Sequence, residues 1–450
     1  MNKDETAARG PTSVSETPFR LLWAGQSVSV IGDGASALAV PLVVFRLTGS
    51  PVATALAAAA RTLGYLAAGF VAGPVIDRVP ARTAMIVADL LRAASYLILV
   101  VLVAVSTPGA GTIIAVAVAA AAVGVFFDTA YAVLVQDLLR TEDLVAGNAR
   151  LEMSNQIGVL AGPALVGALI GPLGSAGVLA LNAGSYLVSV ASLAFLRAPT
   201  ATSLTVRTDV RGVVHDLLSG LQYIGRHRLV LALAGFQSAV NFFLGAETLV
   251  VFFAQRTLHL SAIMTAVVVS AGAAGGILGA VIAERAARAV PATMGIAAGV
   301  VLLAFSLAAL GGAGGAWSAA LANTGMGAGS VFATVHIRAL RQRVVPRELL
   351  GRVTSTARTL AVAANPAGAA LAGLATAAAS DNPRPAFVVA GICLGGSGAL
   401  GYLVGLRRAA EPGAIGTPDA TLSPDATLSP DATVNPDAVG AAVDPPVHRS

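Results

Sequence analysis

Residues 69–82, GFVAGPVIDRVPAR, decide the fold. This stretch closes a long apolar run with Asp77-Arg78 and then adds Pro80 and Arg82 before the next apolar run. Moving an Asp or Arg side chain to the centre of a bilayer costs about 2.5–3.5 kcal/mol on insertion scales. The charged turn therefore stays near the membrane interface, and the stretch predicts two membrane helices joined by a short loop.

The composition indicates a membrane protein throughout. The chain is 56% hydrophobic and only 11% charged, whereas soluble domains contain about 25% charged residues. Apolar runs of about 20 residues, each long enough to cross a bilayer, recur along most of the chain. We therefore expect an all-α polytopic protein rather than a β-barrel, which would show short alternating segments. The first 18 residues are polar, so we expect no signal peptide.

The apolar runs predict twelve membrane spans in two six-helix halves. The spans of the first half are 20–45, 52–76, 83–105, 111–136, 150–171 and 175–196. Those of the second half are 228–255, 262–283, 292–311, 316–337, 352–378 and 385–406. With this assignment, 22 of the 28 basic residues fall in segments on one side. The positive-inside rule then places both termini in the cytoplasm, and we expect a multi-pass protein of the plasma (inner) membrane.

The rare residue types exclude several kinds of site. Lys3 is the only lysine, so the chain lacks the lysine that a phosphate-binding P-loop requires. Cys393 is the only cysteine, which excludes a disulfide or a cysteine-based metal site. The net charge of +5 is explained by the loop arginines. We therefore expect no metal, no cofactor and no nucleic-acid partner.

The segments outside the spans divide the chain into five parts. These are a polar N-terminal segment (1–18), two halves (19–198 and 228–408), a cytoplasmic linker (199–227) and a tail (409–450). Apolar residues recur at helical spacing over 210–224, which predicts an amphipathic helix on the membrane surface or, alternatively, a soluble connector. The tail repeats Pro-Asp every six residues and is predicted to be disordered.

The two halves look like parallel repeats. At an offset of 206 residues, Gln136 corresponds to Gln342 and Gly162 to Gly368. At an offset of 207, Asp77-Arg78 corresponds to Glu284-Arg285. Each half contains an even number of predicted helices, so the repeats are related by an axis along the membrane normal. The fifth span also carries a glycine motif, GVLAGPALVG, with Gly158, Gly162, Pro163 and Gly167. Its glycines would let another helix approach closely, and its proline would bend the helix.

Three stretches of the sequence resemble stretches of the Major Facilitator Superfamily. Residues 69–82 are similar to the loop between its helices 2 and 3, where Gly73, Asp77, Arg78 and Arg82 match and Val79 replaces a usual glycine. The glycine motif of the fifth span resembles the antiporter motif of the exporters. The opening segment FRLLWAGQS is similar to the drug-exporter branch that includes macrolide efflux proteins and the enterobactin exporter. The resemblance covers residues 19–408.

The resemblance implies a transporter with the major facilitator fold. It is expected to act as a monomer and not to be an enzyme. In the family, the acid of the loop motif meets the N-terminal end of helix 11, which here would begin near Arg352. Asp77 would then act as a latch that holds the inner side closed.

Charged residues inside the spans are the candidate functional residues. Asp33 and Arg61 lie at similar depth and are expected to pair, either as a proton-coupling switch or as a static packing contact. Asn241 is the repeat counterpart of Asp33 and is expected to line the same cavity. Glu247 is a second candidate proton site.

Three further charged residues are expected to act at the inner gate. Asp128 would reach Arg78 or Arg82, and Glu152 would pair with its repeat counterpart Arg358 to bridge the halves. Asp89 and Arg92 are expected to lie shallow enough to snorkel to the interface.

We therefore predict a secondary-active exporter of small amphipathic organic molecules, such as drugs, antibiotics, siderophores or secondary metabolites, driven by proton antiport. The sparse charge expected in the cavity suits a weakly polar or cationic cargo. Nutrient uptake and a non-transporting sensor on the same fold are the alternatives. An intramembrane protease is disfavoured: Gly395-Gly-Ser397-Gly398 resembles its serine motif, but His336 is the only histidine in a span.

Overall fold

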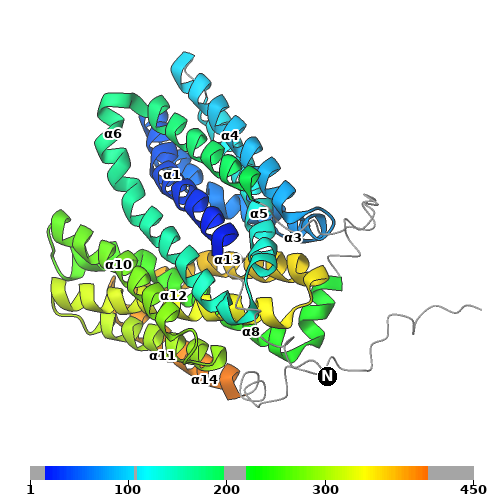
Figure 1. Ribbon diagram of the computed structural model, residues 1–450. Helices are drawn as coiled ribbons and strands as arrows, with labels where there is room; N and C mark the ends of the chain where they lie inside the picture. The colour runs from blue at the N-terminus through cyan, green and yellow to red at the C-terminus, as the bar shows by residue number, and fades with distance from the viewer. Residues whose placement is uncertain (1–15, 106–108, 197–218, 404–450) are drawn as a thin grey trace, which may run out of the picture. The chain divides into compact units, whose positions relative to one another are not determined.

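The computed structural model describes residues 16–105, 109–196 and 219–403 (Figure 1). The described part is entirely helical, and nine of its helices are long and apolar enough to cross a membrane. The N-terminal segment, most of the linker and the C-terminal repeat tail lie outside the described residues, so their predicted structures stay predictions. The described helices belong to one compact unit.

The N-terminal half follows the predicted spans with longer helices. Its elements are α1 (Glu16–Thr48), α2 (Pro51–Ala58), α3 (Ala60–Ile76), α4 (Ala81–Val105), α5 (Ala110–Leu138), the 3₁₀ turn η1 (Thr141–Asp143) and α6 (Leu144–Phe195). The long helix α6 covers both the fifth and the sixth predicted span. It bends at Gly174, whose φ of 67° and ψ of 178° are not helical, so α6 consists of two segments.

The C-terminal half is interrupted in its first predicted span. Residues 228–257 form α8 (Arg228–Leu244), the 3₁₀ turn η2 (Gly245–Leu249), the short α9 (Val250–Phe252) and the π-helical turn η3 (Phe253–Thr257). The remaining elements are α10 (Ala262–Ala286), α11 (Ala292–Gly311), α12 (Ala316–Val344), α13 (Arg347–Ala378) and α14 (Arg384–Gly401). Helix α13 begins at Arg347, five residues before the predicted start of its span.

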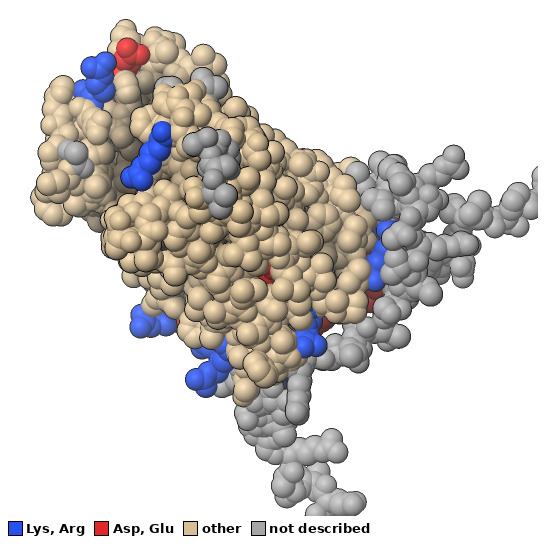
Figure 2. Space-filling view, turned by 90° about the horizontal axis from the view of Figure 1, so that it is seen from above, with Lys and Arg blue, Asp and Glu red and all other residues tan. Residues whose placement is uncertain are grey.

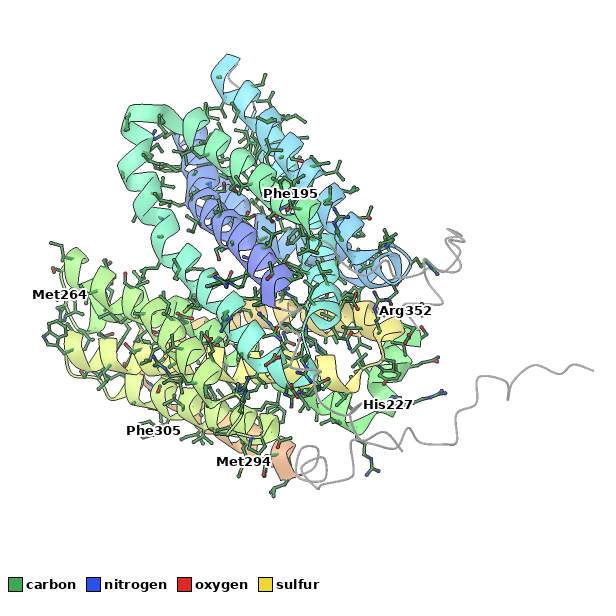
Figure 3. All side chains as sticks on the ribbon, in the orientation of Figure 1. Phe195, His227, Met264, Met294, Phe305 and Arg352 are labelled. Carbon is green, nitrogen blue, oxygen red and sulfur yellow. The ribbon has the colours of Figure 1, made fainter. Side chains whose placement is uncertain are left out.

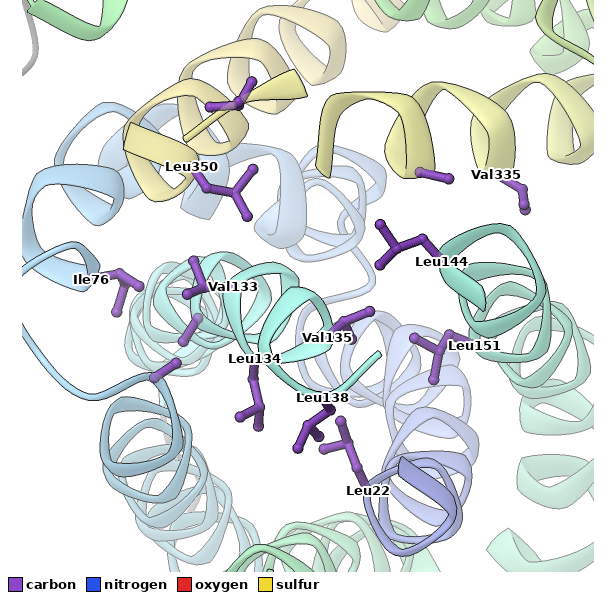
Figure 4. Packing of buried hydrophobic residues seen from close by; sticks show 14 of the residues in the cluster. Leu22, Ile76, Val133, Leu134, Val135, Leu138, Leu144, Leu151, Val335 and Leu350 are labelled. Carbon is purple, nitrogen blue, oxygen red and sulfur yellow. The ribbon is translucent and has the colours of Figure 1, made fainter. Parts of the chain in front are cut away.

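Apolar side chains both fill the interior and cover the outside. One buried cluster joins the two halves at the ends of α3, α5, α6, α12 and α13, and includes Ile76, Leu134, Leu144, Val335 and Leu350 (Figure 4). Large apolar side chains also point outward: Phe195 is 78% exposed and Phe305 is 72% exposed (Figure 3). The face seen in Figure 2 is mostly uncharged, as expected where lipid rather than water covers the helices.

The described end of the linker, residues 219–226, is helical. Ile224 is buried and belongs to the same cluster that joins the halves. A Cβ added to Gly220 would lie 3.1 Å from the Cβ of Arg352, so this segment packs against the start of α13. This part of the predicted amphipathic helix therefore contacts the protein.

Candidate functional site

A cavity of about 390 Å³ lies between the two halves. The N-terminal half contributes side chains from α1, α3, α4, α5 and α6, and the C-terminal half contributes side chains from α12 and α13. Its apolar walls include Val30, Phe127, Tyr131 and Leu151. The volume falls within the range of about 300–1,000 Å³ that is typical of sites for small organic molecules.

The lining of this cavity is strongly charged, contrary to the sparse charge expected from the sequence. Five arginines and three carboxylates line it: Arg61, Arg92, Arg338, Arg341, Arg358, Asp33, Asp128 and Glu152. Buried charges are stable only when they are paired or hydrogen-bonded. The partner of each charge therefore defines the chemistry of the site.

Asp33 pairs with Arg92 rather than with Arg61. Both carboxylate oxygens of Asp33 accept from Arg92 Nη2 at 2.8 Å, and the hydroxyl of Tyr186 also donates to Asp33. Arg92 Nη1 lies 3.4 Å from the buried Asp89, and its guanidinium stacks over the ring of Tyr186. Arg92 does not snorkel: it lies in the middle of α4, and its side chain is only 12% exposed.

The two acids assigned to the inner gate also have other partners. Asp128 forms an ion pair with Arg358 at 3.1 Å and accepts from the Tyr65 hydroxyl, so it does not pair with Arg78 or Arg82. Glu152 pairs with Arg338 at 2.7 Å, so the expected Glu152–Arg358 pair is not formed. Both observed pairs nevertheless bridge the two halves.

Arg82 and the three remaining cavity candidates, Arg61, Asn241 and Glu247, complete the comparison with the sequence. Arg82 donates to the carbonyls of Leu193 and Ala194 at the end of α6, each at 2.7 Å. Arg61 lines the cavity and also a smaller one of about 150 Å³ inside the N-terminal half. Asn241 lines neither of these cavities and donates to the Gln237 carbonyl. Glu247 lies exposed in η2, also away from both cavities.

Asp77 docks on the start of α13, a helix that also lines the cavity through Thr354 and Arg358. Its Oδ1 accepts from the backbone N–H of Gly351 at 2.9 Å and its Oδ2 from that of Arg352 at 3.2 Å. Arg352 Nε lies 3.0 Å from Oδ2, and only 2% of the Asp77 side chain is exposed. Burial raises the pKa of Asp77 to about 7, against the opposing effect of the Arg352 cation and the two backbone N–H groups.

The Asp77 contact depends on two glycines. A Cβ on Gly73 would lie 2.5 Å from the Cα of Arg352, and a Cβ on Gly351 would lie 2.2 Å from Asp77 Oδ1. The backbones of α3 and α13 can approach this closely only because both positions lack a side chain. Gly73 of the sequence motif is therefore part of the docking geometry, together with Asp77.

Further contacts join the two halves. Arg347 forms two hydrogen bonds with the carboxylate of Asp137, and Arg150 Nε pairs with Glu284 at 2.7 Å. The repeat counterparts Gln136 and Gln342 also meet, because Gln136 Nε2 donates to the Gln342 carbonyl at 2.7 Å. We call this set of contacts, with Asp77 docked on α13, the Asp77 gate.

The glycine motif of α6 lies against α1. A Cβ on Gly162 would lie 2.1 Å from the carbonyl carbon of Gly34, and one on Gly158 would lie 2.5 Å from the Val30 oxygen. Gly167 has open space around it. Pro163, next to the contact, lines the cavity. The motif thus sets the distance between two helices that form the cavity wall.

Sequence reasoning missed several residues of the site. The predicted span 316–337 leaves Arg338 and Arg341 outside the membrane, whereas α12 continues to Val344. The position of Arg92 midway along its apolar run is a signal that favours a place inside the protein over snorkelling. Tyr65 and Tyr186, which donate to the cavity acids, carried no sequence signal of their own.

Comparison with known proteins agrees with this architecture. The profile of the Major Facilitator Superfamily matches residues 22–369. The chain belongs to this superfamily. The superfamily consists of membrane transporters, which are typically not enzymes, so the cavity between the halves is the expected place for a transported molecule.

Two relatives are multidrug efflux pumps. The pump Tap of Mycobacterium tuberculosis (strain ATCC 25618 / H37Rv) is 27% identical over 387 residues, which covers 82% of this chain and 88% of the relative. The pump Tap of Mycolicibacterium fortuitum is 26% identical over 219 residues, covering 47% of this chain. This match spans about half of the M. fortuitum protein, 53% of its length.

Solved structures of major facilitator transporters share the fold. A bacterial homologue of the iron transporter ferroportin in the outward-facing state has a TM-score of 0.67 at 15% identity, covering 88% of this chain and all of that one. The human organic anion transporter MFSD10 (TETRAN) also gives 0.67, at 16% identity, covering 86% of this chain and 98% of that one. At such identities the likeness concerns the fold alone.

Proposed function

We propose that this major facilitator protein is a secondary-active exporter of small amphipathic organic molecules, driven by proton antiport. The observation that carries the proposal is the charged cavity between the halves. The contacts of the Asp77 gate, which join the same two halves, support it. The similarity to two multidrug efflux pumps favours export over nutrient uptake or sensing. The cargo would be a drug, an antibiotic, a siderophore or a secondary metabolite.

The proposed location is the plasma membrane. The proposed topology has twelve spans, with both termini in the cytoplasm. Nine described helices qualify by length and composition. The total becomes twelve when α6 is counted as two spans and when α3 and α12 are added. The arginine-rich loops, including the Asp77 loop, then lie on the cytoplasmic side. The protein would work as a monomer.

In this orientation the Asp77 gate closes the cytoplasmic side, as in an outward-facing transporter. To open inward, the halves would have to separate at Asp77 and also at the deeper pairs Glu152–Arg338 and Asp128–Arg358. Each pair has one member on either half, so rocking the halves breaks them together. The Gly158–Gly162 contact lies within one half and would move as a rigid unit.

Proton coupling would use Asp33. Asp33 and Asp89 both contact Arg92, so two carboxylates share one cation. A proton on Asp33 would remove one of the two negative charges and release Arg92 towards Asp89. The conformation that holds the ion pair and the one that holds the proton would then differ in free energy, which is what a coupled transporter requires. Arg61 would border this site from α3, and Asn241 and Glu247 would have no part in it.

The experiment uses inverted membrane vesicles that are acidified inside. Addition of lipophilic cations, macrolides or siderophores is expected to release protons from vesicles containing the wild-type protein. Asp33→Asn should abolish this release, whereas Glu247→Gln, away from the cavity, should retain it. Substrate-driven efflux without any proton movement would contradict proton antiport, and gradient-driven accumulation in the uptake direction would contradict export.

A further inference from the structure

Five arginines and three carboxylates line the cavity, so two of the arginines, Arg61 and Arg341, form no ion pair with a lining carboxylate. Each of its three acids is already paired: Asp33 with Arg92, Asp128 with Arg358 and Glu152 with Arg338. Arg61 lies close enough to Asp128 to share part of its charge. Arg341 is different, because its charged neighbours are the arginines Arg338 and Arg358.

Arg341 is also buried and held in place. It is 3% exposed, and its Nη1 donates to the side-chain oxygen of Gln237 on α8 at 2.7 Å. Among the described residues this is the one hydrogen bond that its side chain makes, whereas a guanidinium carries five N–H donors. An arginine stays protonated in proteins, so burial does not remove this charge.

An unpaired buried charge costs free energy, and a ligand of opposite charge would recover it. The planar donor fork of arginine matches the two oxygens of a carboxylate. The same cavity offers apolar and aromatic surface at Phe127, Tyr131 and Leu151. A molecule with an acidic group at one end and an apolar body at the other satisfies both parts of the lining.

We infer that the cavity binds amphipathic organic acids and that Arg341 holds their carboxylate. This inference rests on the proposed transport function, because it specifies the chemical class of the cargo. It replaces the weakly polar or cationic cargo expected from the sequence. An organic anion also suits export from a cell with a negative interior, because the membrane potential drives a negative charge outward.

The test compares two probes of nearly equal size, 1-naphthylacetate and its uncharged amide, 1-naphthylacetamide. Their binding to the purified full-length protein in detergent is measured by calorimetry. Wild type is expected to bind the acid at least about tenfold more tightly than the amide, the factor that one charge-assisted hydrogen bond provides. Arg341→Gln should reduce this ratio to about one, and Arg288→Gln, an exposed arginine outside the cavity, should leave it unchanged.

A second variant distinguishes loss of the carboxylate site from misfolding of the Arg341→Gln protein. Gln237→Glu places a carboxylate within hydrogen-bond distance of Arg341 without removing the arginine, and it should also abolish the preference for the acid. Lack of preference in wild type, including equally undetectable binding of both probes, overturns the inference, as does a preference that survives both Arg341→Gln and Gln237→Glu. Binding is measured without a gradient, so failure of export in vesicles would count against the proposed function alone.

Discussion

Two repeat-related segments of this protein each place an acidic residue against the opposite half, but the chemistry of the two contacts differs. Asp77, directly after α3, docks on α13, and its counterpart Glu284, in the last turn of α10, pairs with Arg150 of α6, so each half is held by an acid of the other. Asp77 is 2% exposed and accepts two backbone N–H groups, whereas Glu284 and Arg150 are 30% and 40% exposed and form a side-chain pair. The buried contact of Asp77 requires the backbones of two helices to lie close together, whereas the exposed Glu284–Arg150 pair does not. The first segment should therefore control the gate, and the second should contribute little.

The strongest way to break this asymmetry is Gly73→Ala. The added Cβ would lie 2.5 Å from the Cα of Arg352, a backbone atom that cannot rotate away as a side chain can, so the closed gate should lose about 3 kcal/mol. Ala280 occupies the counterpart position of the second segment and is accommodated. Distances between spin labels on cysteines replacing Glu142 and Glu348, in a Cys393→Ser background, would report the opening.

Gly167→Ala is the matched control, because a Cβ at that position meets open space. It should leave the label distances unchanged. If the gate stayed closed in Gly73→Ala, closure would not depend on the close approach of α3 and α13.

Asp77→Ala should have the next largest effect. It removes the acceptor of two backbone N–H groups and leaves Arg352 without this carboxylate, which should weaken the closed gate by about 1–3 kcal/mol. Asp77→Asn keeps one acceptor oxygen and has no charge to bury, so it should retain closure better than the alanine variant. The same label pair measures both variants, and equal populations in all three proteins would remove Asp77 from the gate.

The gate should also respond to pH in a definite direction. The pKa of Asp77 is about 7 in the closed gate, against an ordinary value of 3.8 when the side chain is exposed in the open gate. The closed state therefore binds the proton more tightly, and its advantage is lost as pH rises through 7. Lowering the pH from about 8 to about 6 should favour closure about tenfold.

Asp77→Asn isolates this response, because it removes the titrating group. Its label distances should change little over the same range. A response that persists in Asp77→Asn would belong to another group.

The smallest effect is expected at the second segment. Glu284→Gln removes an exposed ion pair, so the closed gate should weaken by about 0.2–1 kcal/mol. Combining Glu284→Gln with Arg150→Gln should add little to the single change, because both substitutions remove the same contact. If Glu284→Gln opened the gate as far as Asp77→Ala, the two segments would be equivalent after all.

The described helices follow the apolar runs of the sequence, but hydropathy did not show which residues contact one another. An apolar run of about 20 residues marks a span because it must cross the hydrocarbon, whereas the C-terminal end of α12 and the N-terminal end of α13 continue past their apolar runs and lack this signal. For the same reason the sequence placed Arg338 and Arg341 outside the cavity. The Asp77 motif and the α6 glycines were informative because their contacts use the backbone of a neighbouring helix.

The sequence could not show which charged residues pair with one another. Asp33 and Arg61 lie at similar depth, but which arginine reaches Asp33 depends on how α1, α3 and α4 are rotated about their axes. The structure turns Arg92 towards Asp33, with Tyr186 beside it. A repeat offset likewise related Glu152 to Arg358 without showing that each would meet a different partner.

The contact between Gln136 and Gln342 has a consequence for the origin of the chain. These glutamines are counterparts in the two repeats, and each donates to the backbone of the opposite half: Gln136 to Gln342, and Gln342 to Ala132. In a symmetric homodimer, a residue near the twofold axis lies beside its own copy, as these two counterparts do here. A half-length ancestor could have assembled from two separate subunits through the same glutamine, and gene fusion would then have preserved an interface that already existed.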